Sequence, residues 1–320
     1  MSVILQSSGS VRLTTGSGLD EIFDSAFEQD RQPGEVRADD PLFFKQDNTE
    51  WLAIQYAESQ GPGDFTEVIE DEEVPEATVR IGNRTVAEVF DYNRDIHIPE
   101  RYQESSVHYK TVEDWVMKLG IRARTSRDKF AFRRSYGNAF STDIATPDGA
   151  APVSNAHTTL NSDTIDNLET GVLNATNLET LVRSLQLQRA QDGDLGSYFA
   201  DAVLCPRILH PDMIEITKSE LQAGTGNNNR NYWSYIYPGM VVGSSVFLDS
   251  TYNTLNTNAN TSYFVISKMH SITRAVRIPI KREYIDPMYD RRRRAFYRAH
   301  YSERTYVGTW GGLVGSNGTV

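Results

Sequence analysis

The sequence predicts an α+β fold with mixed, mainly antiparallel sheets. Helical spacing of apolar residues occurs in only a few segments, and the longest lies at residues 108–137. Strand-like apolar segments follow one another closely from residue 240 onward. Strands that are adjacent in the sequence favour antiparallel pairing over alternating parallel units, so the predicted class is α+β.

Residues 1–50 form the least self-sufficient segment. Ser, Gly, Thr, Asp and Gln dominate it, and its one helical pattern is Leu19, Ile22, Phe23 and Phe27. Such a segment either stays without fixed structure or lies along another surface.

Residues 50–100 have the pattern of a long hairpin that projects from the body. Strand-like segments at 51–56 and 84–92 flank a Gly-Pro-Gly turn and an acidic run, Glu70, Asp71, Glu72 and Glu73. So few apolar residues build no core, and an isolated hairpin needs a neighbour to stabilise it.

A long helix is predicted next. Thr111 and Asp114 have the spacing of a helix start, and apolar residues follow at helical spacing until Gly137-Asn138 ends the pattern. At about 1.5 Å per residue this helix is on the order of 40 Å long. Its other faces are either solvated or contacted by acidic segments or nucleic acid, because they carry Lys118, Arg122, Arg124, Arg127, Lys129, Arg133 and Arg134.

The remaining elements alternate. A capping pattern of Thr176 and Glu179 predicts a helix that ends at Asp192-Gly193 and buries Leu178, Leu181, Val182 and Leu185. A short strand at 202–205 leads into Pro206, and a helix is expected over 212–221. Further strands are expected at 240–248, 263–268, 272–281, 296–302 and 306–314.

The composition excludes several classes of protein. The 320 residues contain one cysteine, Cys205, which excludes a disulfide framework and a cysteine-rich zinc module and is expected to be a small buried hydrophobe. No stretch approaches the roughly 20 apolar residues of a membrane span, and the start lacks a signal-peptide core. We therefore expect no membrane contact.

The net charge of −11 is unevenly divided. Residues 1–100 carry a balance of −15 and the rest a balance of +4, and Arg outnumbers Lys by 25 to 7. Parts of opposite sign let copies of one chain attract each other, and guanidinium groups suit lasting ion pairs at interfaces. The alternative is that these charges only decorate a solvated surface.

No motif for catalysis stands out. The sequence has no Walker loop, GxGxxG, nucleophile elbow or His-Glu-x-x-His. Ser154, His157 and Asp163 could form a triad only if the fold brought them together. The acidic run at 70–73 lacks the ligand spacing of a calcium loop, so an interface element is favoured over a cation site. The basic run at 291–294 could bind nucleic acid, but an anion contact within or between subunits is favoured because the chain is acidic.

One ordered set of motifs carries a resemblance. Residues 148–157 read DGAAPVSNAH, a helix then ends in a polar turn at 189–194, and a strand runs into Pro206. A Tyr/Trp/Asn segment at 227–237 precedes the strand at 241–248, and a strand–Arg-rich–strand series closes in Trp310-Gly311-Gly312. Over roughly residues 40–315 this order resembles the major capsid protein of tailed phages and related archaeal viruses, of the Hong Kong 97 type fold. It is most similar to the Mu-like major head subunit branch, which carries a DG-x-PLFS-x-AH stretch.

The resemblance implies a division of the chain. An N-terminal arm (1–47) would lie over neighbouring subunits, an extended-loop hairpin would span 48–100, and a peripheral domain at 101–164 would hold the spine helix at about 108–137. An axial domain with returning peripheral strands (165–315) and a tail (316–320) would follow. No assembly-directing segment precedes the arm, so a separate scaffold or none would serve.

The resemblance also implies a function. The chain would be a non-catalytic head protein, with no cofactor and no metal, that assembles as hexamers and pentamers into an icosahedral shell around viral dsDNA. It would reside in the virion, assemble in the host cytoplasm, contact DNA only non-specifically, and partner itself, a portal, a scaffold and decoration proteins. Contacts between subunits are expected at Glu70, Asp71, Glu72, Glu73, Arg122, Arg127, Arg133, Arg134, Arg291, Arg292, Arg293 and Arg294. The alternatives are an encapsulin-like compartment shell and a soluble hydrolase that uses Ser154 and His157.

Overall fold

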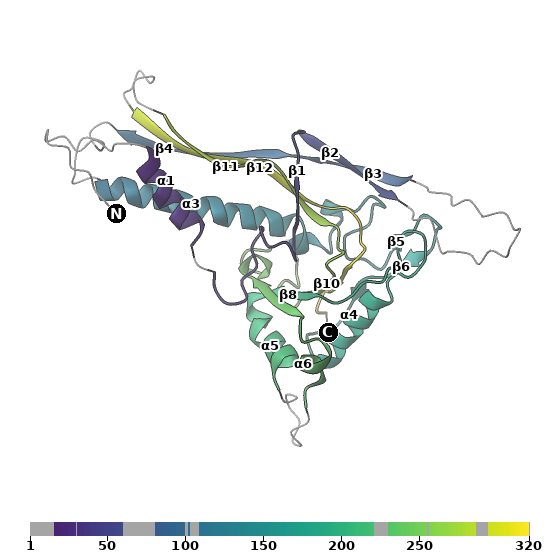
Figure 1. Ribbon diagram of the computed structural model, residues 1–320. Helices are drawn as coiled ribbons and strands as arrows, with labels where there is room; N and C mark the ends of the chain where they lie inside the picture. The colour runs from purple at the N-terminus through teal and green to yellow at the C-terminus, as the bar shows by residue number, and fades with distance from the viewer. Residues whose placement is uncertain are drawn as a thin grey trace, which may run out of the picture.

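The computed structural model describes residues 16–29, 31–59, 81–99, 102, 109–220, 230–254, 256–285 and 294–319. A long sheet lies over a long helix, and a second sheet with shorter helices forms a wedge below them (Figure 1). The architecture is α+β, as the sequence predicts. Within the ranges given above, no helix combines the length and the apolar character that crossing a bilayer requires.

The long sheet has the strand order β1-β11-β12-β4. Its centre is the antiparallel pair of β11 (Ile272–Ile285) and β12 (Arg294–Val307). On the outer sides, β4 (Phe90–Pro99) is antiparallel to β12, and β1 (Lys45–Asn48) is parallel to β11. The Tyr92 and Tyr301 rings stack across the β4–β12 pair with centroids 5.0 Å apart, and such cross-strand aromatic pairs stabilise one register.

The long helix α3 (Tyr109–Arg133) packs beneath this sheet, with α1 (Gly16–Phe27) beside it (Figure 1). Its 25 residues give a length of about 37 Å, close to the predicted rod. Gly120 is the point of closest approach, because a Cβ there would lie 2.6 Å from the carbonyl oxygen of Phe23. One apolar cluster joins the two helices to the sheet through Leu19, Phe23, Val112, Val116, Ile98 and Tyr297.

The described part of the predicted N-terminal arm packs on the chain's own body, and its contact with neighbouring subunits stays a prediction. The apolar face of α1 is buried on α3, as the sequence pattern of that helix allows. Phe43 and Phe44 lie in the central core, and the Tyr136 hydroxyl donates a hydrogen bond to the carbonyl of Phe43 at 2.8 Å. Residues 1–15 lie outside the described residues.

The predicted projecting hairpin is confirmed in part. β2 (Ala53–Ser59) and β3 (Ile81–Glu88) pair antiparallel and extend to one side of the molecule (Figure 1). Residues 90–99, which the sequence analysis placed in the same projection, instead form β4 of the long sheet. The hairpin therefore contacts the body at its base, where the Tyr56 and Tyr306 rings stack 4.5 Å apart.

The second sheet has the order β7-β13-β10-β8-β9 and mixes parallel with antiparallel pairs. A separate two-stranded ladder pairs β5 with β6. Cys205 is buried in this sheet's core, as expected, and its pKa is raised to about 12 by burial. The strands are β5 (His157–Thr158), β6 (Thr164–Ile165), β7 (Leu168–Glu169), β8 (Ala202–Pro206), β9 (Val241–Ser245), β10 (Tyr263–Ile266) and β13 (Leu313–Ser316). The helices packed on the second sheet are α4 (Ala175–Gln186), α5 (His210–Lys218) and α6 (Tyr232–Ile236).

Two element boundaries correct the sequence prediction. The cap of α4 is Asn174, whose side chain accepts from the amide of Asn177, and Thr176 lies inside the helix, which ends at Gln186. The strands expected at 296–302 and 306–314 are one strand, β12, followed by the short β13. The predicted buried face of α4, with Leu178, Leu181, Val182 and Leu185, is confirmed.

We expect Phe264→Ala to lower the free energy of unfolding by about 3–5 kcal/mol. Phe264 is fully buried, and its ring lies 5.5 Å from those of Tyr136 and Phe140, so truncation leaves a cavity in the central core. Urea denaturation followed by circular dichroism measures the change. The control is Phe199→Ala, because Phe199 is 68% exposed and should change the free energy by less than about 0.5 kcal/mol.

Candidate assembly surfaces

Large apolar side chains are exposed on the β2–β3 hairpin and at its base. Trp51 is 75% exposed and Leu52 62%, and Ile81 and Val86 are also exposed. Trp51 and Leu52 are adjacent near the base, Val86 pairs with Gln55, and Ile81 lies opposite Ser59 at the other end of the strands. Exposed apolar residues spread along one hairpin offer area for burial by a partner, although single ones need no explanation. The hairpin is therefore a candidate surface for contact with another protein.

The acidic run at 70–73 and three of the four arginines at 291–294 lie outside the described residues. The strands that lead into and out of these two runs are among the described residues. Residues 60–80 leave the body from Ser59 and return at Ile81, at the far end of the hairpin from the Tyr56–Tyr306 stack. Arg294 begins β12, whose other end carries Tyr306. Twelve residues of strand separate these positions, a distance of about 40 Å. The hairpin and the start of β12 thus lie at opposite ends of the long sheet.

The four spine arginines fall into two pairs. The Arg127 side chain is only 13% exposed, lies 3.6 Å from an Asp39 carboxylate oxygen, and covers the Phe27 ring. Arg134 covers the Phe90 ring, with its guanidinium carbon 5.2 Å from the centroid. Both have partners within the chain, and contact with another subunit stays a prediction for all four arginines. Arg122 and Arg133 are exposed.

The suggested triad of Ser154, His157 and Asp163 is not present. The buried His157 ring pairs through Nδ1 with Asp148 at 2.7 Å, and the Ser154 hydroxyl accepts from the amide of Ala156. Burial opposes ionisation of Asp148, but hydrogen bonds from His157 and Thr146 hold its pKa below the ordinary value. The Ser154 hydroxyl and the His157 ring thus each have another partner, so the structure does not assemble the suggested triad. No group of three or more His, Cys, Asp or Glu among the described residues could hold a metal ion.

Glu58 is a site residue that the sequence analysis missed. It lies near the end of β2, is fully buried, and neither of its carboxyl oxygens has a hydrogen-bond partner. Burial, with the nearby charge of Asp148, raises the pKa of Glu58 to about 7. Gly82 across the hairpin admits Leu160, whose Cδ2 would be 2.4 Å from a Cβ at that position. The hairpin is thus held against the body next to a carboxyl group that loses its proton near neutral pH.

We expect Glu58→Gln to raise the free energy of unfolding by about 2–3 kcal/mol at pH 8 and to change it little at pH 4. The pKa of Glu58 is higher in the folded protein than its ordinary 4.5, so native stability is lost as the pH rises from about 4.5 to about 7. Urea denaturation at both pH values measures this. Glu88→Gln, an exposed position on the same hairpin, is the control. An equal effect of Glu58→Gln at both pH values would contradict the role of its ionisation.

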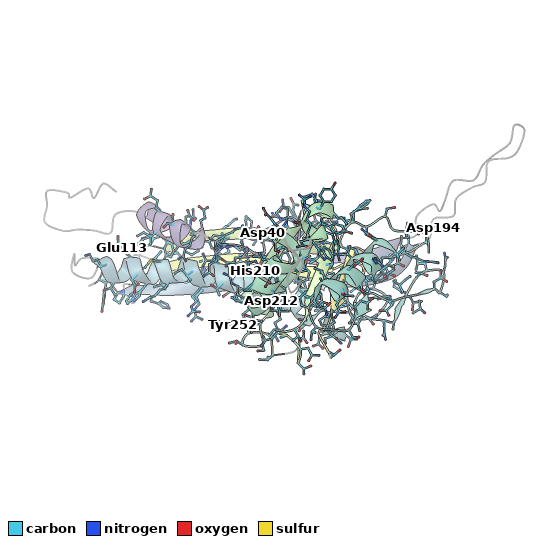
Figure 2. The ribbon with its side chains drawn as sticks, turned by 90° about the horizontal axis from the view of Figure 1, so that it is seen from below. Asp40, Glu113, Asp194, His210, Asp212 and Tyr252 are labelled. Atoms are coloured by element: carbon cyan, nitrogen blue, oxygen red, sulfur yellow. The ribbon has the colours of Figure 1, made fainter. Side chains whose placement is uncertain are left out.

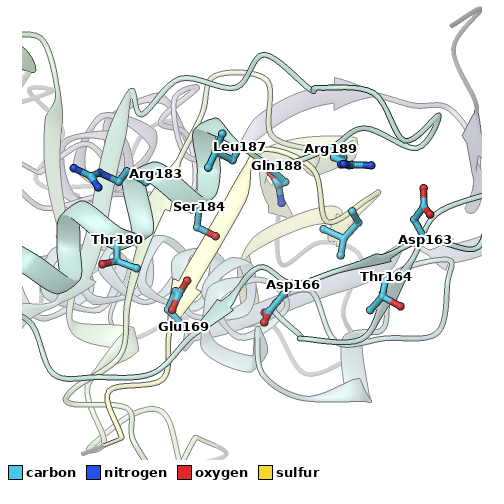
Figure 3. Close-up of a pocket in the computed structure, with 11 residues that line it drawn as sticks. Asp163, Thr164, Asp166, Glu169, Thr180, Arg183, Ser184, Leu187, Gln188 and Arg189 are labelled. Atoms are coloured by element: carbon cyan, nitrogen blue, oxygen red, sulfur yellow. The ribbon is translucent and has the colours of Figure 1, made fainter.

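A cleft of about 640 Å³ lies between the β6–β7 segment and α4 (Figure 3). Asp163, Asp166 and Glu169 line one side, and Arg183 and Arg189 come from α4 and the residues after it. Burial and the charge of Asp166 raise the pKa of Glu169. The cleft therefore brings charges of both signs together with the hydroxyl groups of Thr164, Thr180 and Ser184.

The sequence pattern could have predicted the contact between Asp148 and His157 but not the burial of Glu58. Asp148 and His157 both belong to the stretch at 148–157, so their proximity could have been expected. Glu58 reads as an ordinary polar strand residue, and nothing in the pattern marks it as buried.

Comparisons with known proteins bear on the fold. No family model matches the chain, and no curated protein matches it. Among solved structures, the capsid of Ralstonia phage GP4 is similar with a TM-score of 0.55, 10% identity and 88% coverage of each chain. The mature capsid of bacteriophage PhiM1 is similar with a TM-score of 0.54 and 10% identity, and the match covers 90% of each chain. The virus-like particle from Pyrococcus furiosus is similar with a TM-score of 0.51 and 10% identity, and the match covers 94% of this chain and 98% of that chain.

These likenesses define the class of fold. They extend over nearly the whole chain, at an identity so low that only the architecture is shared. The chain has the Hong Kong 97 type capsid fold, with the β2–β3 hairpin, α3 as the long helix and the second sheet as its main parts.

Proposed function

We propose that this chain is the major head subunit of an icosahedral shell, assembling as hexamers and pentamers around a viral dsDNA genome. The observation that carries the proposal is the hairpin, whose large apolar side chains are exposed at the periphery of the subunit. A subunit of this shape is completed by its neighbours, and extended contacts adapt to the slightly different settings of a closed shell. The shared fold with phage capsids supports this function.

The subunit contact is proposed to run head to tail. The acidic run at 70–73 of one copy would lie on the basic run at 291–294 of the next. The basic run joins β12 at one end of the long sheet, about 40 Å from Tyr306, and the hairpin that leads to the acidic run contacts the sheet at Tyr306, so the two runs meet more readily between copies than within one. This placement favours the run at 291–294 over Arg127 and Arg134, which are occupied in their own chain.

Charge alone does not hold such a shell together. Each exposed ion pair contributes about 0–1 kcal/mol, so the cohesion must come from buried area, and the charges set the register. The exposed hairpin residues Trp51, Leu52, Ile81 and Val86 provide apolar area for burial.

The remaining roles follow from the same proposal. The chain acts without catalysis, resides in the virion after assembly in the host cytoplasm, and meets a portal, a separate scaffold and decoration proteins. The stretch at 148–157 supports a place in the Mu-like branch.

Electron microscopy of the purified protein tests the proposal. We expect closed shells with icosahedral order. A monodisperse monomer or dimer under all assembly conditions would overturn the proposal, and shells filled with a cargo enzyme would favour the encapsulin-like alternative.

A further inference from the structure

Four exposed cations share one stripe of α3. Lys118, Arg122, Lys129 and Arg133 are all exposed, and their spacing of 4, 7 and 4 residues places them within an arc of about 60° on the helix. Along the axis they span about 22 Å. We call this set the α3 stripe.

The stripe is not neutralised by the chain itself. Arg122, Lys129 and Arg133 have no ion-pair or hydrogen-bond partner among the described residues, and Lys118 pairs only with Asp114, one turn away, at 2.6 Å. The opposite side of α3 is covered by α1 and the long sheet through Val112, Val116 and Leu119. Seen from below, α3 lies along the underside of the molecule with α1 beside it (Figure 2). The stripe is therefore an open, positively charged surface.

The stripe offers little exposed apolar area, and this indicates the kind of partner. Between residues 118 and 133 its arc carries no large apolar residue, and Trp115, which falls on the same arc one turn before Lys118, is only partly exposed. Protein interfaces have an apolar centre that is depleted of charge. Met117 is the one large apolar residue of α3 that is clearly exposed, and it lies about 100° from Lys118 around the helix axis. The hairpin and its base, by contrast, expose four large apolar residues: Trp51, Leu52, Ile81 and Val86. A row of cations without an apolar centre suits a partner that is held by charge alone, and a regular polyanion provides that.

We propose that the α3 stripe binds the backbone phosphates of duplex DNA, so that this face of the subunit lines the interior of the shell. The inference rests on the proposed function and adds the orientation of the subunit and the residues that meet the genome. With both strands counted, duplex DNA carries one charge per about 1.7 Å of its axis, so a length of about 22 Å holds about a dozen phosphates around its circumference, and those on the side that faces α3 can meet the stripe.

The net charge of −11 does not prevent this contact. Exposed charges are screened over about 8 Å at physiological ionic strength, so a phosphate at the stripe is affected mainly by the nearest side chains. Asp114 is the one carboxylate on this exposed arc, and it is already paired with Lys118. The contact is expected to be independent of DNA sequence, because α3 would reach phosphates and not base edges.

Binding of a labelled 30-base-pair duplex to unassembled subunits tests the stripe. We expect the Arg122→Gln, Arg133→Gln double variant to bind on the order of 50-fold more weakly at 0.1 M salt, with the slope of log K against log salt smaller by about 1.8. The matched control is Arg94→Gln with Arg189→Gln, two exposed arginines that likewise lack ion pairs among the described residues. The control is expected to bind as the parent chain does.

Two results would overturn the inference. Equal loss of binding in both double variants would mean that DNA responds only to total charge. A synthetic peptide of residues 64–76, which carries seven acidic residues, is the second probe. If this peptide binds the stripe and the duplex does not, the stripe is a contact for a neighbouring subunit instead.

The orientation has its own test in assembled shells. The only native thiol, Cys205, is buried, so Ser126→Cys next to the stripe introduces the one reactive cysteine. We expect a bulky maleimide polymer to label it only after disassembly, and labelling of intact shells would overturn the interior placement. Failure to form shells refutes the proposed function but leaves the duplex measurement valid, because that measurement uses unassembled subunits.

Discussion

Reversing Glu70, Asp71, Glu72 and Glu73 to lysine is expected to abolish shell assembly and to leave the subunit folded. The change replaces four negative charges with four positive ones, a net shift of +8, in a segment proposed to lie on a neighbour's basic run, so attraction becomes repulsion at every copy of the contact. Four consecutive charged residues contribute little to a hydrophobic core, so the fold should not depend on the run. Sedimentation velocity and negative-stain electron microscopy measure assembly, and circular dichroism measures folding.

A charge exchange sharpens this experiment. If the acidic run docks on the run at 291–294, changing residues 291–294 to glutamate should block assembly of the otherwise native chain. The same change made in the lysine variant should restore assembly, because the two runs again carry opposite charges. Normal shell yield with unchanged salt sensitivity in the first variant would refute the docking of the acidic run. Loss of assembly that the glutamate change does not restore would mean that the acidic run contacts a surface other than residues 291–294.

Arg274→Ala is expected to lower the free energy of unfolding by about 3–5 kcal/mol, because it leaves a buried carboxyl group without its cation. Arg274 is 4% exposed and Glu303 6%, and the two face each other across β11 and β12 at 3.9 Å. The Arg274 guanidinium also donates to Gln46 of β1 at 2.9 Å. One side chain therefore joins three strands of the long sheet.

The effect should grow with pH. Burial already raises the pKa of Glu303 to about 7, and the charge of Arg274 opposes that rise. Without Arg274 the pKa rises further, so ionising Glu303 costs more, and the loss of stability is larger at pH 8 than at pH 5. Urea denaturation at both pH values measures this.

Two variants serve as controls for Arg274→Ala. Arg277→Ala removes a more exposed cation that lies 3.7 Å from Asp91, and should cost less than about 1 kcal/mol. The double variant Arg274→Met, Glu303→Leu removes both buried charges, and should be less destabilised than Arg274→Ala. If the double variant is the less stable of the two, the cost of a lone buried charge does not explain the effect.

The sequence predicted those elements whose apolar spacing is set within one segment. α3 and α4 were found in this way, because each buries a face with helical periodicity, and α5 was placed by the proline at its start. β1 was missed because its residues, Lys45–Asn48, are polar and mostly exposed, and only backbone pairing with β11 makes them a strand. β12 was divided because Ser302, Glu303 and Thr305 resemble a turn, although all three are buried.

The candidate contact residues were harder to predict for a related reason. Helical spacing places all the spine arginines on α3, but it does not say which face will be covered. Arg127 is covered by Phe27 and Asp39, and Arg134 packs on Phe90, so residues remote in sequence decide which cations stay available. The exposure of Arg122 and Arg133 follows from tertiary packing alone.

The β2–β3 hairpin is fixed to the body at two places along its strands. Midway along β2 the Tyr56 ring stacks on Tyr306 of β12. Near the end of the same strands Glu58 is buried and Gly82 lies against Leu160, in the segment between β5 and β6. Two supports resist tilting of the hairpin as a unit, so in the proposed shell a force applied to the hairpin by a neighbour would be passed on to the long sheet through Tyr306 and to the β5–β6 segment through Leu160.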